Sequence, residues 1–262
     1  MTPILVFDIE TVPDVAGYRV LENLPAELAD ADVAEMAFHH RRAQTGSDFM
    51  PLHLQKVVAI SCVLRAGESW KVWSVGTLED DEATLIQRFY DGIEKFTPTI
   101  VSWNGGGFDL PVLHYRGLIH GVTAERYWDL GDGDYNDSRD FKWNNYISRY
   151  HTRHTDLMDL LAMYQPRASA PLDALAKLSG FPGKLGMDGS AVWGAYSAGK
   201  LEEIRNYCET DVVNTYLVYL RFQRMRGHMD AAAYEREVAL VRETLEGMGE
   251  SHWREYLEAW KT

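Results

Sequence analysis

Near its start the chain has a run of residues in which odd-numbered and even-numbered positions both carry apolar side chains. In an extended strand over residues 4–9 (ILVFDI), apolar side chains point to both faces. The two sets are Ile4 with Val6, and Leu5 with Phe7 and Ile9. A strand that is apolar on both faces is typical of the centre of an α/β sheet. We therefore predict a central strand at residues 4–9.

Three later segments carry the same kind of signal. Residues 56–64 (KVVAISCVL) and 69–75 are apolar runs joined through Ala66-Gly67, which predicts an antiparallel pair. Residues 99–103 (TIVSW) predict a further buried strand, and residues 155–164 predict a short strand or a helix.

Between these strands, several segments have apolar residues at helical spacing. Pro25 introduces a helix at 26–42 that ends near Gly46, inside a long excursion after the first strand. The other helices are expected at 80–95, 110–116, 172–179 and 201–219, with two more within 229–262. This order predicts an α/β fold, a mixed sheet with helices on both faces.

In the last helices, one face repeats large apolar residues: Trp253, Tyr256, Leu257 and Trp260. Docking of this face on the core is favoured, and an oligomer contact is the alternative. We expect an α/β domain over residues 1–225, with an insertion at about 12–52, and a helical extension over 226–262 packed on the same domain.

Two carboxylates stand at the end of the first predicted strand. Asp8 and Glu10 point to the same face, about 7 Å apart along the strand. Two adjacent acids on a buried strand are costly unless a positive group compensates them. The chain has a second Asp-x-Glu, Asp80 with Glu82, but that pair stands where a helix should begin and is interpreted as a capping feature.

Two more fragments place acids in comparable settings. Asp109 follows Asn104, three glycines and Phe108, so it is either the first acid of the next helix or a site acid at the end of a strand. Tyr207 and Asp211 stand four apart on a helix, one turn along the same side. Four clustered carboxylates would hold a pair of divalent cations, and hard oxygen ligands favour Mg²⁺ or Mn²⁺ over zinc.

These three fragments together carry a resemblance. FDIET, N-x-x-x-F-D and Y-x-x-x-D are similar to the three motifs of the DEDD 3′–5′ exonucleases of the tyrosine subclass, and most similar to the proofreading exonuclease domain of family B DNA polymerases. The resemblance spans residues 4 to about 220. It implies a ribonuclease H-like fold with a mixed five-stranded sheet. No polymerase domain follows before Thr262, so we expect a stand-alone relative.

The resemblance also implies residue roles. Asp8, Glu10, Asp109 and Asp211 would hold two divalent ions, Mg²⁺ or Mn²⁺, and Tyr207 would position the attacking water. Thr11, Asn104 and Phe108 would line the substrate cleft. Asp156 and Asp159 compete for the place of a supporting acid.

Composition narrows the function further. A net charge of −13 argues against a sequence-independent coat for nucleic acid. Cys62 and Cys208, far apart, argue against a disulfide scaffold or a zinc ribbon. No apolar run is long enough for a signal peptide or a membrane span, so we expect a soluble, cytoplasmic protein.

One segment, residues 139–154, combines basic and aromatic side chains. It is interpreted either as a contact for single-stranded nucleic acid or as a surface insertion whose aromatics dock on the core. We expect a 3′–5′ exonuclease acting on single-stranded DNA. The alternatives are an exoribonuclease and a non-catalytic nucleic-acid-binding module.

Overall fold

A five-stranded sheet forms the centre of the computed structural model, which describes residues 2–260. The strands are β1 Ile4–Pro13, β2 Gln55–Ala66, β3 Ser69–Ser74, β4 Thr99–Ser102 and β5 His154–Asp156. They are arranged in the order β3-β2-β1-β4-β5. β1, β2 and β3 pair antiparallel, whereas β4 and β5 run parallel to β1. The predicted mixed α/β sheet is confirmed.

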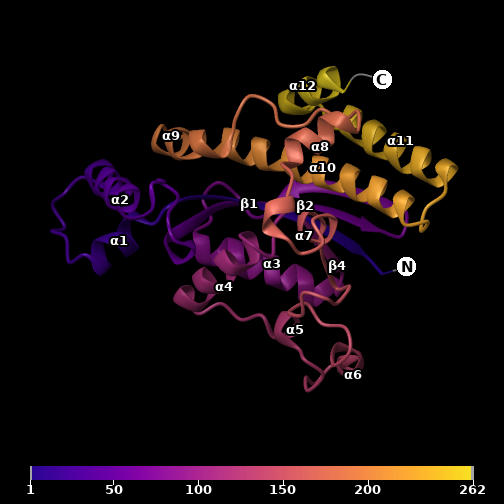
Figure 1. Cartoon of the computed structure of the whole chain (residues 1–262), viewed down its shortest axis with the longest axis horizontal. Helices are drawn as coiled ribbons and strands as arrows, with labels where there is room; N and C mark the ends of the chain where they lie inside the picture. Colours follow the sequence, from indigo (N-terminus) through magenta and orange to yellow (C-terminus); the bar gives the residue numbers. More distant parts are fainter. Residues whose placement is uncertain (1, 261–262) are drawn as a thin grey trace.

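Helices cover both faces of this sheet (Figure 1). The longer helices are α2 Asp30–Thr45, α3 Glu82–Phe96, α4 Asp109–His120, α10 Leu201–Met225, α11 Ala231–Met248 and α12 Ser251–Ala259. The shorter ones are α1 Val15–Leu21, α5 Glu125–Trp128, α6 Ser138–Phe141, α7 Leu157–Leu161, α8 Leu172–Leu178 and α9 Val192–Ser197. Single 3₁₀ turns, η1 to η3, lie at Leu52–Leu54, Pro166–Ala168 and Gly189–Ala191.

The two faces of β1 belong to two separate cores, as the alternation of its residues predicts. Val6 belongs to a core cluster with residues of α10, α11 and α12, whereas Phe7 belongs to a second cluster with residues of α3 and α4. Side chains two positions apart on a strand share a face. Asp8 and Glu10 therefore continue the row of Val6 and point toward α10.

β1 is longer than the sequence predicts, and this changes where its acids lie. The strand runs to Pro13 because β2 pairs with it along its whole length, with a register shift between Glu10 and Thr11. Its parallel pairing with β4 covers only Ile4 to Val6. The acids are thus inside the strand and not at its end, just beyond the point where β4 stops accompanying it.

The insertion after β1 also differs from prediction. The predicted helix at 26–42 begins instead at Asp30 and ends at Thr45, with Gly46 left-handed (φ 77°) as its C-cap. Residues 25–29 are not helical, because Arg19 of α1 binds the carbonyl oxygens of Pro25 and Leu28 at 2.8 and 3.0 Å. α1 itself was not predicted. Figure 1 shows α1 and α2 set apart from the sheet.

At the carboxyl end, α11 and α12 pack on α10. Trp253 and Tyr256 are fully buried, and the Tyr256 hydroxyl donates to Asn214 on α10 at 2.8 Å. The apolar face of the last helices therefore docks on the core. The division of the chain at about residue 225 stays a prediction.

The second Asp-x-Glu pair has a different role from the one predicted. Asp81 caps α3, and Glu82 is buried, where it accepts two hydrogen bonds from Arg116 at 2.8 and 2.6 Å. Arg116 also pairs with Asp14 at 2.5 Å. This buried network ties the start of the insertion to α3 and α4, so Glu82 anchors tertiary structure and does more than complement a helix dipole.

Within residues 2–260, none of the helices is both long and apolar enough to cross a membrane.

Candidate active site

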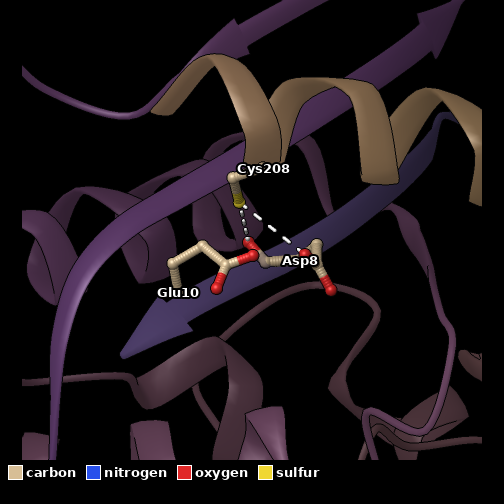
Figure 2. Close-up of side chains that lie close together, drawn as sticks. All are labelled: Asp8, Glu10 and Cys208. Carbon is tan, nitrogen blue, oxygen red and sulfur yellow. Dashed lines mark hydrogen bonds between the residues drawn. The ribbon is translucent and has the colours of Figure 1, made fainter. Parts of the chain in front are cut away.

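Asp8 and Glu10 lie side by side beneath α10. Figure 2 shows their carboxylates on one side of β1, with the Cys208 thiol of α10 pointing at them. One ligand atom from each of the three side chains lies within 4.8 Å of the others. The thiol donates to the Asp8 carbonyl oxygen at 3.4 Å, with Asp8 Oδ2 at 3.7 Å. Burial raises the pKa of Cys208 well above its ordinary value, so the thiol keeps its proton.

Asp109 reaches this pair from the other side of β1. It is the first residue of α4 and is buried, and its Oδ1 accepts the Ile9 N–H at 3.2 Å. That N–H belongs to the part of β1 that β4 no longer accompanies. The carboxylate of Asp109 therefore takes a place at the open edge of the sheet, beside Asp8 and Glu10.

The loop before α4 is held in a tight turn. Asn104 is left-handed (φ 65°), and its carbonyl oxygen accepts the N–H groups of Gly107 and Phe108, both at 3.0 Å. A Cβ on Gly105 would lie 2.2 Å from Ser102 Oγ, so no side chain fits there. Asp156 accepts the N–H groups of Asn104 and Gly106 at 3.0 and 2.9 Å.

The competition between Asp156 and Asp159 is thereby resolved in geometry. Asp156 supports the loop that carries Asp109, whereas Asp159 pairs with Arg149 at 2.5 Å. The geometry favours Asp156 for the place of the supporting acid, and that role stays a prediction.

Tyr207 and Asp211 complete the cluster from α10, where both are buried. Asp211 Oδ2 lies 2.9 Å from Nζ of Lys184, which also donates to the Tyr207 hydroxyl. Asp211 Oδ1 is buried and has no hydrogen-bond partner among residues 2–260. Such an orphaned carboxylate oxygen is rare in native interiors and fits a cation ligand.

Lys184 was missed by sequence reasoning. It stands in the loop after α8, where no periodicity marks it. The Asn214 side chain of α10 binds Gly183 on both its N–H and its carbonyl, at 3.2 and 2.9 Å. Gly183 is left-handed (φ 72°), and this clamp delivers the next residue, Lys184, to the acids.

Burial raises the pKa values of all four acids, and the neighbouring acids raise those of Asp8 and Glu10 further. Burial is the largest cause for Asp8, followed by the charges of Asp109, Glu10 and Asp211. For Glu10 burial is again first, then Asp211. Burial raises the pKa of Asp109 to about 7, and the pKa of Asp211 is also raised by burial, against the opposing effect of Lys184.

Lys184 responds in the opposite sense. Burial disfavours its ammonium form, but Asp211, Asp8 and Glu10 outweigh that effect, so the pKa of Lys184 is raised and it stays charged. One ammonium cannot neutralise four carboxylates. The donor set is oxygen-rich, crowded and short of positive charge, which is the chemistry that Mg²⁺ or Mn²⁺ satisfies.

The three predicted substrate residues lie at two cavities. Thr11 and Phe108 line a cavity of about 740 Å³ that includes Glu10. Asn104 lines another, of about 550 Å³, together with Asp156 and Arg149. Thr11 is held in place by a hydrogen bond from its hydroxyl to Gln55 at 2.9 Å.

The aromatic and basic segment at 139–154 divides between the two interpretations. Phe141 and Tyr146 are buried in the core beneath the sheet. Trp143 and Tyr150 are exposed, by 77% and 72%. Docking on the core therefore accounts for part of the aromatic content, and a contact with nucleic acid stays a prediction for the rest.

A pH-dependent change in stability follows from Asp109. Its folded pKa, about 7, exceeds the ordinary value of 3.8, so the neutral form stabilises the fold. That contribution is fully present below pH 3.8 and is lost as the pH rises toward 7. In EDTA, Asp109→Asn should match the wild type in unfolding free energy near pH 4 and exceed it increasingly up to about pH 7.

Urea unfolding of both proteins across this pH range measures the difference, which removes the contributions of titrating groups that Asp109 does not influence. Asp8 and Glu10 add to the difference in the same direction, because the charge of Asp109 raises their pKa values. A difference that does not change with pH would show that Asp109 ionises freely in the fold.

The sheet carries acids on its central strand, on the helix after a glycine-rich loop and on a late helix, in the order in which the three sequence motifs occur. Residues 47–260 match the family described as "Predicted 3'-5' exonuclease related to the exonuclease domain of PolB", and the chain belongs to this family. The resemblance to the proofreading exonucleases of family B polymerases is confirmed. The match begins after Asp8 and Glu10, whose place in the cluster rests on the geometry above.

Curated relatives agree with this assignment. The chain is 30% identical over 154 residues to the catalytic subunit of DNA polymerase epsilon from Saccharomyces cerevisiae, and 31% identical over 149 residues to the corresponding protein of Kluyveromyces lactis. Each alignment covers 55% of this chain and 6% of the relative. The chain thus corresponds to a small part of the length of these polymerases.

Proposed function

We propose that this protein is a metal-dependent 3′–5′ exonuclease that hydrolyses phosphodiester bonds from the 3′ end of single-stranded nucleic acid, with DNA as the expected substrate. One observation carries the proposal: carboxylates from β1, α4 and α10 converge, and Asp211 Oδ1 among them is buried without a partner in residues 2–260. A fold that gained nothing from these acids would bear their desolvation and repulsion without compensation.

The acids are assigned as ligands of two divalent ions, Mg²⁺ or Mn²⁺. Asp8, Glu10 and Asp211 would hold one ion, and Asp8 and Asp109 the other. Two such ions, when bound, would supply a nucleophile at neutral pH and would neutralise the charge that develops on the attacking and leaving oxygens. The Ile9 N–H holds Asp109, and the loop carried by Asp156 fixes the start of α4.

Tyr207 is assigned a positioning role. Burial, followed by the charges of Asp211, Glu10 and Asp8, raises its pKa above the ordinary value of 10. The phenol oxygen therefore keeps its proton at neutral pH and cannot serve as a base. The Lys184 ammonium donates a hydrogen bond to the Tyr207 hydroxyl. We assign to these two polar groups the orientation of water and phosphate oxygens beside the acids.

Side-by-side degradation assays test the proposal. We expect the purified full chain to shorten labelled single-stranded DNA one nucleotide at a time from the 3′ end with Mg²⁺ or Mn²⁺, and to leave it intact with EDTA. Matched RNA and blunt duplex DNA identify the substrate class.

Preference for RNA would make the protein an exoribonuclease. Metal-independent binding of single strands without cleavage would favour the non-catalytic module, and the proposal would then be abandoned.

A further inference from the structure

The 740 Å³ cavity beside Glu10 is walled by the insertion as well as by the sheet. Glu10 and Thr11 of β1 lie on one side of its lining, Phe38 and Phe49 come from α2 and the loop after it, and Trp193 comes from α9. The insertion therefore completes a cavity that reaches the acid cluster at Glu10. Its volume falls within the roughly 300–1,000 Å³ that is usual for a small-ligand site.

Phe49 is the most conspicuous side chain of this lining. It is 55% exposed, and its ring centroid lies 5.6 Å from that of Phe108 at an interplanar angle of 52°. Across the same cavity, Phe38 and Trp193 meet edge to face at 6.4 Å. Large aromatic faces left open beside a polar centre are costly in water and are the surfaces on which nucleobases stack.

The lining of this cavity is mainly acidic, so it would repel a phosphate group. Glu10, Glu35 and Asp48 contribute carboxylates. Among the described residues that form the lining, Arg42 is the one Lys or Arg, and it is already engaged by Asp48 through hydrogen bonds of 2.6 and 2.7 Å. An internal segment of a nucleic-acid strand, which carries a phosphate at each nucleotide, would be repelled by this lining.

The 3′ end of a nucleic-acid strand avoids this repulsion. Beyond the bond that an exonuclease cleaves, the 3′-terminal nucleoside carries a base, a sugar and a hydroxyl, but no further phosphate. Its one phosphate is the scissile one, which belongs at the acids next to Glu10. An aromatic, acidic cavity adjoining the acids therefore suits the terminal nucleoside.

We infer that the insertion forms the subsite for the 3′-terminal nucleoside, with the terminal base stacked on Phe49 where that ring leans on Phe108. This inference rests on the proposed exonuclease function and assigns to the insertion a role in holding the end of the substrate. It makes Phe49 a substrate-binding residue.

Fluorescence of 2-aminopurine tests the assignment, because stacking on an aromatic ring quenches it. Single-stranded DNA with the probe at its 3′ terminus is mixed with the Tyr207→Phe protein and Mg²⁺ in a stopped-flow instrument and read before turnover. We expect quenching on binding. The additional change Phe49→Ala should abolish it, and Phe49→Trp should retain it. A probe placed several nucleotides inward should be insensitive to both.

Kinetics on the wild-type background give the second readout. Phe49→Ala should lower kcat/KM on single-stranded DNA by roughly 10- to 100-fold, and Phe49→Trp should restore most of the loss. Phe96→Ala is the matched control, because Phe96 is a partly exposed phenylalanine at the end of α3, in a different cavity. Thermal unfolding of each variant checks that the fold is kept.

The outcomes separate the two claims. A wild-type protein without nuclease activity would overturn the proposed function itself. An active wild type in which Phe49→Ala keeps both its kcat/KM and the terminal quenching would overturn only the subsite. The same holds if a 3′-phosphate is accepted as readily as a 3′-hydroxyl, since the acidic lining should reject it.

Discussion

Replacing Asp8 by alanine should abolish nuclease activity, with a fall of more than about 10³-fold, since loss of a shared metal ligand removes several kcal/mol of transition-state stabilisation. The fold should survive. Asp8 has its pKa raised by burial and by three neighbouring acids, so its removal relieves repulsion in the metal-free protein. The unfolding free energy in EDTA should be unchanged or higher.

Hydrolysis of a labelled oligonucleotide and urea unfolding measure the two effects. Asp80→Ala is the matched control, because it breaks the other Asp-x-Glu of the chain. Its side chain accepts from Thr77 N–H and pairs with Arg88, away from the acid cluster, so activity per folded molecule should not change. Near-normal hydrolysis by a rigorously purified Asp8→Ala protein would show that the activity lies elsewhere.

Tyr207→Phe should separate chemistry from metal binding. The change removes a hydroxyl and no metal ligand, so affinity for Mg²⁺ or Mn²⁺ should barely move. Turnover should fall by roughly 10²- to 10³-fold, the cost of one positioned hydrogen bond in the transition state. Calorimetric titration with Mn²⁺ and single-turnover hydrolysis provide the two measurements.

Tyr216→Phe serves as its control on the same helix. Tyr216 is also buried, but its hydroxyl donates to Glu237 at 3.0 Å, outside the acid cluster. Activity should stay at the wild-type level. Loss of metal binding together with activity in Tyr207→Phe would mean that the phenol supports the site structurally, and its positioning role would have to be dropped.

The parts of this site that the sequence predicts are those with a local signature. Alternation along β1 placed Asp8 and Glu10 on one face, and helical spacing placed Tyr207 and Asp211 on one side of α10; the structure keeps both arrangements. Each pattern depends on neighbours within a few positions, which is the range over which period and propensity act.

What the sequence does not predict depends on distant contacts. Lys184 has no local mark, because it is placed through Gly183 by Asn214, which lies 31 positions from that glycine. The helix in the insertion starts late because Arg19 binds the carbonyls before it. The length of β1 is set by its pairing with β2. In each case a tertiary partner overrides the local signal.

The contact between Cys208 and Asp8 joins positions 200 residues apart. During translation, β1 emerges first and α10 late, so the nascent chain carries Asp8 and Glu10 without Asp211, Tyr207 or the loop that α10 holds in place. Contacts of such long range are among the last that a folding chain can make. Under the proposed function, hydrolytic capacity should therefore arise only once α10 has been added, and chains that end before α10 should be inert toward nucleic acid.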